Sequence, residues 1–297
     1  MIIIICSIYK LNYYLTIIFR LTQKLFMKKK TLYLVRLPLI SVIIFSLLIF
    51  GCNSKNNEWE NLIINNSLEG WHIFQDDGTK DGWYVENQIL IFDAISDLES
   101  GKGDSSLLSN KEYMSFEIEF EWKIEKGGNS GFMWGVKEDS KYKYPYQTGP
   151  EIQIIDIAIY NKPNEVLGGE IELNNVLADL DEKKHYLGAV YDIYSPKQIK
   201  LYNSAGSWNK YYIKIDQKNN LGQVKLNDKL INEFELNGDV WDEMYLNSKF
   251  NDSESEESEY LGERRWYDFA KFKKGHICFQ DHPGKAYFKN IRIKELN

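Results

Sequence analysis

The sequence has few cysteines, prolines and histidines, and it lacks the short motifs of the commonest enzyme families. Three cysteines among 297 residues exclude a disulfide framework, and six prolines argue against a proline-rich linker protein. No nucleophile elbow, zinc-protease motif, phosphate loop or dinucleotide fingerprint occurs. We therefore expect no nucleotide or organic cofactor. Aromatic residues are plentiful at 14%, which excludes a wholly disordered chain.

Acidic residues are absent from the first 52 positions, which carry seven basic ones. The formal net charge of the whole chain is −7, so the remainder carries −14. An acidic body does not suit a nucleic-acid backbone, which needs a cationic face. We expect a neutral ligand or a cation as partner, and no nucleic acid.

The N-terminal region has the layout of a secretory signal. Met27–Lys30 is basic, residues 37–50 are apolar apart from two serines, and Gly51 precedes Cys52. This end is similar to a bacterial lipobox, in which the cysteine is lipidated. The alternative is an uncleaved transmembrane anchor, for which the apolar run is short. Residues 1–26 resemble an extension upstream of the true start, or else a first membrane segment.

These features predict the domain organisation and the location of the protein. Residues 1–52 form an upstream extension plus lipoprotein signal, residues 53–60 form a tether, and residues 61–297 form a single domain. We expect a lipid-anchored protein of the bacterial cell envelope, periplasmic or surface-exposed. The sequence does not indicate an oligomeric state.

The body is predicted to be an all-β sandwich or jelly roll. Residues 116–124 alternate strictly between apolar and charged, which is typical of a half-buried strand. Further strands are predicted at 132–136, 151–155, 211–215, 223–226, 276–280 and 285–293, with a turn at Asn227-Asp228. Helical periodicity is scarce, and one short helix is predicted from Asp239 to Tyr245. Many short strands separated by turns indicate two packed sheets.

Strand alternation sorts the polar residues onto faces. Ile152 and Ile154 face the core in one predicted strand, so Glu151 and Gln153 face away from it. The same argument places Gln280 and His282 on a non-core face of another strand. Together they would form a polar floor suited to a sugar, flanked by aromatic residues that include Trp134, Tyr144 and Tyr191. The alternative is that these polar residues face solvent and the aromatic residues are core.

Four histidines limit the options for a metal site. His185 and Asp192 lie in one short segment, and Asp281 and His282 lie in another. These side chains could provide a mixed nitrogen and oxygen site for a divalent ion, although a lone histidine is more often structural. An acidic run at 251–263 lacks the spacing of a calcium loop and is predicted to be a solvated insertion.

Several motifs occur together in an order that resembles a known family. They are Gly127–Val136, Lys141–Asp156, Gly188–Asp192, Gly206–Asn209, Gly275–His282 and Tyr287–Ile293. This combination resembles the 3-keto-disaccharide hydrolase domain family (DUF1080) over nearly all of residues 68–297. The resemblance implies a concanavalin-like jelly roll and cleavage of glycosides already oxidised to a ketone at C3.

The resemblance also implies a mechanism and roles for residues. A ketone at C3 makes the C2 proton acidic, so a base removes it, the C1 aglycone leaves by elimination, and water then adds. Glu151 and His185 are the implied base and acid, while Asp192, Asp281 and His282 ligate a divalent cation or orient those groups. Tyr144, Gln153, Tyr191, Gln280 and Trp134 are the implied sugar-binding residues. The alternatives are a non-catalytic carbohydrate-binding lectin on the same fold, or a structural envelope protein.

Overall fold

Alternating apolar and polar residues build two antiparallel sheets that face each other. The structure is a computed structural model, and it describes residues 58–75, 82–93, 105–157, 182–197, 202–251, 266–282 and 284–296. All of these belong to one compact unit, Asn57–Asn297. Cys52 and the predicted signal lie outside the described residues, so secretion and lipidation stay predictions. In the part of the chain that is described, no helix has the length and apolar composition of a membrane crossing.

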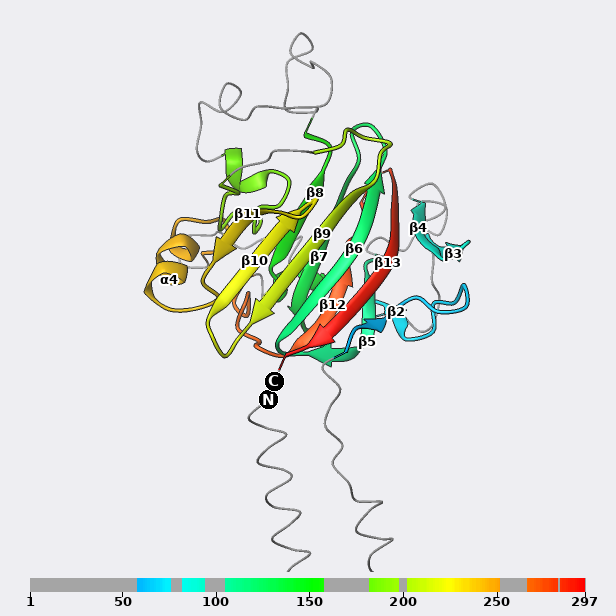
Figure 1. Cartoon of the computed structure of the whole chain (residues 1–297). Helices are drawn as coiled ribbons and strands as arrows, with labels where there is room; N and C mark the ends of the chain where they lie inside the picture. Colours follow the sequence, from blue (N-terminus) through cyan, green and yellow to red (C-terminus); the bar gives the residue numbers. More distant parts are fainter. Residues whose placement is uncertain are drawn as a thin grey trace, which may run out of the picture. The chain divides into compact units, whose positions relative to one another are not determined.

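The larger sheet has eight strands within the described ranges. Seven follow the spatial order β11-β10-β9-β6-β13-β4-β3, and β1 pairs with β13 (Figure 1). Their bounds are β1 Glu60–Asn61, β3 Trp83–Glu86, β4 Ile89–Asp93, β6 Phe116–Ile124, β9 Asn209–Asp216, β10 Leu221–Leu226, β11 Lys229–Phe234 and β13 Lys285–Glu295. The strands at both ends of this order are consecutive in the chain, whereas β9, β6, β13 and β4 in the middle come from distant parts of it, as in a jelly roll.

The smaller sheet carries the candidate site. Its described strands follow the order β2-β5-β12-β7-β8. Their bounds are β2 Trp71–Ile73, β5 Leu107–Tyr113, β7 Asn129–Val136, β8 Glu151–Ile155 and β12 Gly275–Phe279. β8 is the last strand of this order, so one of its edges is open to pairing with the segments that follow it.

The core between the sheets consists of aromatic rings from both of them. Phe120 of β6 lies 5.7 Å from Phe132 of β7 and 5.2 Å from Phe279 of β12, measured between ring centroids. Along β6 every second residue is buried, from Phe116 to Ile124. The predicted alternation of this strand is confirmed, and so is the all-β jelly-roll sandwich.

Local elements also agree with the sequence patterns. The predicted helix is α4, Asp239–Leu246, and its Trp241 is buried against the sandwich. Asn227 and Asp228 both have positive φ, 46° and 66°, which is the conformation of a two-residue hairpin turn. Two short 3-10 helices, η1 Pro145–Gln147 and η4 Glu182–His185, lie on either side of β8 in the sequence.

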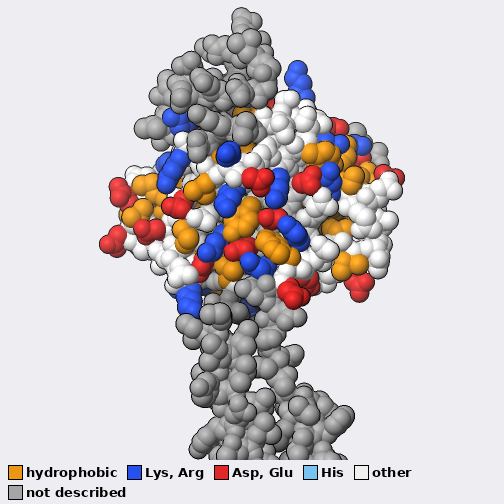
Figure 2. All heavy atoms as spheres, in the orientation of Figure 1, with side chains coloured by type: hydrophobic (Ala, Val, Ile, Leu, Met, Phe, Trp, Pro, Cys, Tyr) orange, Lys and Arg blue, Asp and Glu red, His pale blue; other side chains and the backbone are white. Residues whose placement is uncertain are grey.

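The outer face of the larger sheet carries many ion pairs between neighbouring strands. Figure 2 shows basic and acidic side chains interspersed on this face. Lys294 lies 2.7 Å from Glu117, Lys289 lies 3.2 Å from Glu121, and Arg292 donates to Glu119 through its Nε at 3.0 Å. This face is typical of a solvated sheet surface, where cross-strand pairs of opposite charge meet.

The outer face of the smaller sheet is different in composition. Cys278 and Met133 are fully buried there in a small apolar cluster, whose other members are Phe74, Leu108, Val136 and Tyr142. Cys278 is a free, buried thiol. Glu151 and Gln153 point to this same face at the β7–β8 end of the sheet. They alternate along β8 with Ile152 and Ile154, which point into the core.

Candidate active site

Glu151 is positioned by strand pairing and by a glycine. It begins β8 opposite Met133, and its side chain lies over Gly131 of β7. A Cβ atom at residue 131 would lie 2.1 Å from Glu151 Oε1, so the carboxylate occupies the space that this glycine leaves open. The carboxylate position is therefore fixed by the sheet rather than by a loop.

Two side-chain amides reach the Glu151 carboxylate. Gln280, just after β12, donates from Nε2 to Glu151 Oε2 at 3.5 Å. Gln153 is buried, and in the amide orientation that satisfies its neighbours its Nε2 donates to Glu151 Oε1 at 2.9 Å and to the Ser130 carbonyl at 3.2 Å. Neutral amides orient a carboxylate without neutralising its charge.

Burial makes the Glu151 carboxyl group a weak acid. Desolvation by the surrounding protein raises its pKa from the ordinary 4.5 to about 8, and the positive charge of Lys249 opposes this rise. No ion pair to this carboxylate occurs among the described residues, unlike the carboxylates of the larger sheet. A carboxyl group with a pKa near neutrality is suited to general acid–base chemistry.

His185 and Asp192 form a hydrogen-bonded pair beside β8. His185 Nε2 lies 2.8 Å from Asp192 Oδ1, while Asp192 Oδ2 accepts the backbone N–H of Lys249 at 2.6 Å. Asp192 has a φ of 59°, a left-handed conformation that asparagine and aspartate tolerate better than most residues. With its Nε2 committed to the carboxylate, His185 keeps Nδ1 for a proton transfer; no hydrogen bond of Nδ1 occurs among the described residues.

The segment that carries this pair is fastened to the open edge of β8. The backbone N–H of Tyr191 donates to the Glu151 carbonyl at 2.9 Å, and Gly188 donates to the Gln153 carbonyl at 2.9 Å. The Tyr191 ring lies 4.7 Å from the His185 imidazole, measured between centroids. His185 is therefore held beside Tyr191, next to the Glu151 site.

A cavity of about 290 Å³ opens over Glu151. Aromatic rings form much of its wall, and amides with one carboxyl group, one ammonium and one imidazole supply its polar atoms. The lining residues are Asn129, Tyr146, Gly149, Glu151, Gln153, Tyr191, Lys249, Phe250, Trp266, Phe269, Gln280 and His282. Flat aromatic faces beside a few polar groups suit a sugar ring, whose C–H faces are apolar and whose hydroxyls are polar.

The aromatic wall is a connected stack. Phe250 and Phe269 are parallel with centroids 3.8 Å apart, and Trp266 meets Phe250 edge-on at 4.9 Å. Tyr146 continues the wall at 6.0 Å from Trp266, and Tyr144 lies parallel to Tyr146 at 4.9 Å. Tyr144 thus supports the wall from behind and does not line the cavity itself.

Comparison with known proteins identifies the family. A family model described as a 3-keto-alpha-glucoside-1,2-lyase-like domain matches residues 58–294. The chain belongs to this family.

Relatives of the family agree with this assignment. The chain is 28% identical over 248 residues to a 3-keto-disaccharide hydrolase of Bacteroides thetaiotaomicron, covering 78% of this chain and 76% of the relative. A putative glycosyl hydrolase from Parabacteroides distasonis is 28% identical with a TM-score of 0.63, covering 82% of this chain and 96% of that one. A second putative glycosyl hydrolase from that organism shares the fold at 22% identity and a TM-score of 0.53, covering 80% and 100%. These comparisons support a carbohydrate-active protein of the 3-keto-disaccharide hydrolase kind.

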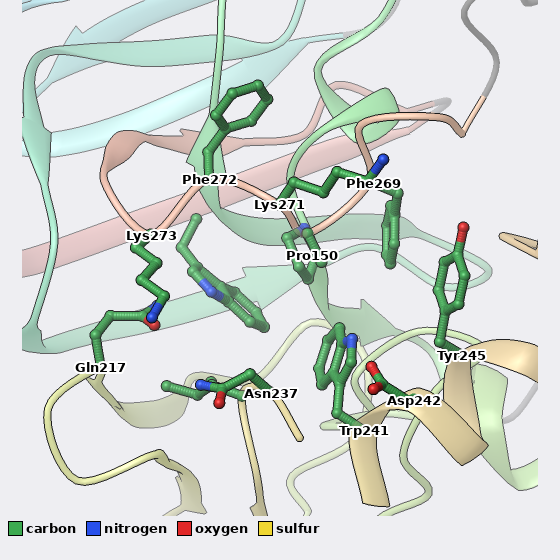
Figure 3. A pocket seen from close by; sticks show the side chains of 13 residues that line it. Pro150, Gln217, Asn237, Trp241, Asp242, Tyr245, Phe269, Lys271, Phe272 and Lys273 are labelled. Carbon is green, nitrogen blue, oxygen red and sulfur yellow. The ribbon is translucent and has the colours of Figure 1, made fainter. Parts of the chain in front are cut away.

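Most of the predicted sugar-binding and catalytic residues of this family member converge. Glu151, Gln153, Tyr191 and Gln280 line one cavity, and the His185 ring contacts that of Tyr191 without lining the cavity itself. Trp134 does not join them. It is buried, its ring lies 6.2 Å from that of Phe234, and it lines a second cavity of about 440 Å³ together with Trp241 and Pro150 (Figure 3). The predicted role of Trp134 in sugar binding is therefore not supported by its position.

Two of the three predicted metal ligands, Asp192 and Asp281, are hydrogen-bonded to other residues. Asp281 accepts the Ser105 backbone N–H at 3.0 Å and the Ser106 hydroxyl at 2.6 Å, which ties the end of β12 to the start of β5. Asp192 is engaged by His185 and Lys249. Within the described ranges no group of three or more His, Cys, Asp or Glu side chains is arranged to hold a metal ion.

The described structure does not gather these residues into one ligand set, so the divalent-cation site stays a prediction. The contacts of Asp192 agree with its other predicted role, which is to orient His185. His282 does line the cavity. Burial lowers the pKa of its imidazole, opposed by the Asp281 charge.

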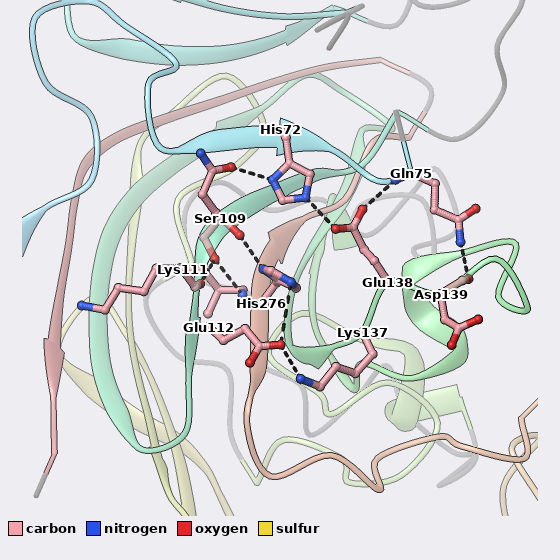
Figure 4. Close-up of polar contacts among 11 residues, drawn as sticks. His72, Gln75, Ser109, Lys111, Glu112, Lys137, Glu138, Asp139 and His276 are labelled. Atoms are coloured by element: carbon pink, nitrogen blue, oxygen red, sulfur yellow. Dashed lines mark hydrogen bonds and ion pairs between the residues drawn. The ribbon is translucent and has the colours of Figure 1, made fainter. Parts of the chain in front are cut away.

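The remaining two histidines form a separate cluster on the same face (Figure 4). His72 Nε2 lies 2.8 Å from Glu138 Oε2, and its ring meets that of His276 edge-on at 5.6 Å. His276 Nδ1 is in turn 2.6 Å from the Ser109 carbonyl. No residue of this cluster lines the Glu151 cavity.

The sequence patterns missed several residues of the site. Lys249 and Phe250 follow α4, while Trp266 and Phe269 come after the acidic segment, and neither stretch shows strand alternation. Gly131 was noted only as part of the Gly127–Val136 motif, with no role in the site. One sequence signal could have indicated these aromatic residues. Phe250 stands just before the acidic run, and Trp266 and Phe269 stand just after it. Large apolar rings beside a charged segment are expected to be buried against the body of the protein.

Proposed function

We propose that this protein is a hydrolase that cleaves 3-keto-glycosides by elimination followed by hydration. The observation that carries the proposal is the Glu151 carboxyl group, whose pKa burial raises to about 8, in an aromatic-lined cavity beside the Asp192–His185 pair. The name of the relative from Bacteroides supports the same substrate class.

The proposed chemistry begins at C2 of the oxidised sugar. Glu151 removes the C2 proton, which is acidic because the neighbouring C3 is a ketone, and the electron pair forms an enolate. The enolate then expels the C1 oxygen, and His185 donates a proton to the departing aglycone. Water adds at C1 of the resulting unsaturated ketone, which returns a proton to C2 and gives the free 3-keto sugar. Overall, one glycosidic bond and one water are consumed.

The composition of the cavity favours this route over ordinary glycoside hydrolysis. Glycosidases that pass through an oxocarbenium-like state use two carboxyl groups, roughly 5–9.5 Å apart. Glu151 is the one carboxylic acid among the described residues that line this cavity. A single base with a histidine acid matches proton abstraction and elimination better.

Turnover of a matched pair of substrates tests the proposal. The protein is mixed with a chromogenic 3-keto-glucoside and with its unoxidised parent, and aglycone release is followed. Release from the keto form alone is expected. No release from either, together with measurable sugar binding, would contradict the proposal and favour the carbohydrate-binding lectin on the same fold.

We further propose that the enzyme acts in the cell envelope, anchored by lipid on Cys52. The support is the order of the basic Met27–Lys30 stretch, the apolar run at 37–50 and the Gly51-Cys52 junction. Labelling with a radioactive fatty acid in the bacterial host tests this directly. Label should enter the native chain and not a Cys52→Ala variant; equal labelling of both, or of neither, would contradict the anchor.

A further inference from the structure

Lys249 places an ammonium group at the Glu151 cavity, and no described residue lies close enough to be its anionic partner. Its Nζ lies 4.3 Å from the Tyr191 ring centroid, 5.3 Å from that of Phe250 and 5.8 Å from that of Trp266. Within the described residues this ammonium makes no hydrogen bond and no ion pair within 4.0 Å. It is held by aromatic faces, which attract a cation but do not neutralise it.

Lys249 and Glu151 interact across the cavity. Burial lowers the pKa of Lys249, while the charges of Glu151 and Asp192 raise it again. Both side chains line the same cavity, yet they are not close enough to form an ion pair. This arrangement leaves room between a base and a cation for a substrate that both can reach.

The backbone of Lys249 shares its support with the proposed acid. Asp192 binds His185 through one carboxylate oxygen and the Lys249 N–H through the other. The backbone of Lys249 and the imidazole of His185 are thus held by one residue. Lys249 is exposed, whereas Phe250 and Trp266 beside it are buried. A cation already held beside the reacting atoms needs little reorganisation when negative charge develops there.

We propose that Lys249 is a catalytic residue that stabilises the enolate; this inference rests on the function proposed above. Its ammonium donates a hydrogen bond to the C3 ketone oxygen. As Glu151 takes the C2 proton, the C2–H electron pair moves into a C2–C3 double bond and negative charge develops on that oxygen. When the C1–O bond breaks, the ketone re-forms and the charge leaves with the aglycone oxygen. Lys249 keeps its own proton throughout.

The test replaces the cation and measures kcat and KM on the chromogenic 3-keto-glucoside. Lys249→Met should lower kcat by about 10²- to 10³-fold, the range seen when a single oxyanion donor is removed. KM should change little, because the charge develops in the transition state. The matched control is Lys225→Met, since Lys225 also lies over a ring, 4.7 Å from the Tyr212 centroid, but is outside the cavity. That control should keep wild-type kcat.

A chemical rescue separates the charge from the packing of the side chain. Lys249→Cys should be nearly inactive and should regain activity after alkylation with 2-bromoethylamine, which rebuilds a lysine-like ammonium in the already folded protein. The native Cys278 is fully buried and should not react. Rescue by iodoacetamide, which adds a neutral group of similar length, is not expected.

The outcomes distinguish a failure of the role proposed for Lys249 from a failure of the proposed function on which it rests. Wild-type kcat in Lys249→Met, while Glu151→Gln is inactive, would overturn the role of Lys249 and leave the proposed function standing. Equal rescue by the charged and neutral alkylating agents would also overturn it, since packing alone would then explain the loss. No turnover of the keto substrate by the wild-type protein would overturn both.

Discussion

The outer faces of the two sheets carry similar side chains in opposite arrangements. On the larger sheet, Glu117 and Glu121 each lie across from a basic residue of a neighbouring strand. On the smaller sheet, Glu151 has amides around it and a cation that it does not touch. Paired charges in water contribute little beyond solubility. An isolated, buried carboxyl group costs stability, and that cost is characteristic of a functional site.

The largest expected effect comes from neutralising the Glu151 carboxylate, which has no ion pair with any described residue. Glu151→Gln keeps the shape of the side chain and removes its basicity, so we expect kcat for the 3-keto-glucoside to fall by about 10³-fold or more. Glu121→Gln on the larger sheet is the matched control and should retain full activity. If steady-state kinetics showed similar kcat values for both variants, the claim that only the face of the smaller sheet carries the catalytic carboxylate would be wrong.

A smaller loss is expected from the histidine pair, and its size should depend on the leaving group. His185→Asn removes the proposed proton donor and should slow release of an alcohol or sugar by about 10²-fold. Release of nitrophenol, which needs little protonation, should change much less. Asp192→Asn should show the same trend more weakly, because it leaves the imidazole in place without its orienting carboxylate. An equal loss for good and poor leaving groups would remove His185 from the acid role.

Filling the space beneath Glu151 should disturb both activity and stability. Gly131→Ala places a methyl group against the carboxylate, so we expect at least a tenfold loss of kcat and about 1–3 kcal/mol of destabilisation from overpacking. The shorter side chain of Glu151→Asp should relieve the collision. Denaturant unfolding of the double variant should therefore show less destabilisation than the sum of the two single changes; simple additivity would argue against the contact.

The raised pKa of Glu151 predicts two dependences on pH. As a base the group must be ionised, so kcat/KM should rise with pH up to about 8. Because the folded-state pKa exceeds the unfolded value of 4.5, the folded chain holds this proton more tightly. Stability from this group is complete below pH 4.5 and is lost as the pH rises toward 8.

Glu151→Gln has no group to titrate at this position, so the variant removes the pH dependence of stability. The difference in stability between wild type and variant therefore measures the cost of burying the ionised carboxylate. The variant should be more stable than wild type at pH 9, by on the order of a few kcal/mol, and the gap should close near pH 4. Thermal unfolding across this range provides the measurement. A gap that did not vary with pH would mean that the carboxyl group titrates normally.

The smallest effect is expected on the face of paired charges. Lys294→Met breaks the ion pair between Lys294 and Glu117, whose side chains are 19% and 17% exposed. The free energy of unfolding should fall by about 0–1 kcal/mol, and kcat should not change. Urea unfolding and a standard activity assay check both statements. A large loss of activity would show that the larger sheet contributes to function after all.

The fold was predictable because its signals are local. The alternation along Phe116–Ile124, the Asn227-Asp228 turn and the helix beginning at Asp239 each depend on neighbouring residues, and each is present. Glu151, Gln153 and Gln280 could be assigned to a non-core face by the same period of two. Alternation says which way a side chain points, and this was sufficient to find half of the site.

The rest of the site depends on contacts that local patterns do not encode. Asp281 resembled a metal ligand, but it binds Ser105 and Ser106, which are 176 and 175 residues away. Trp134 was expected near sugar, but β7 turns it into the core. Lys249 was missed because its place in the cavity depends on contacts with Tyr191 and Trp266, which are far from it or separated from it by the acidic run in the sequence. Such convergence is decided by tertiary packing.

Exchange of the C2 proton with solvent tests the central claim most directly. A 3-keto-glycoside is incubated in heavy water with the wild-type protein and with Glu151→Gln, and the recovered 3-keto sugar is examined by NMR for deuterium at C2. The account predicts deuterium at C2 of the sugar released by the wild type and neither release nor exchange above background with the variant. Release by the wild type of a sugar that keeps its original C2 hydrogen, at a rate that deuterium placed at C2 of the substrate does not slow, would contradict proton abstraction and the role of Glu151 with it.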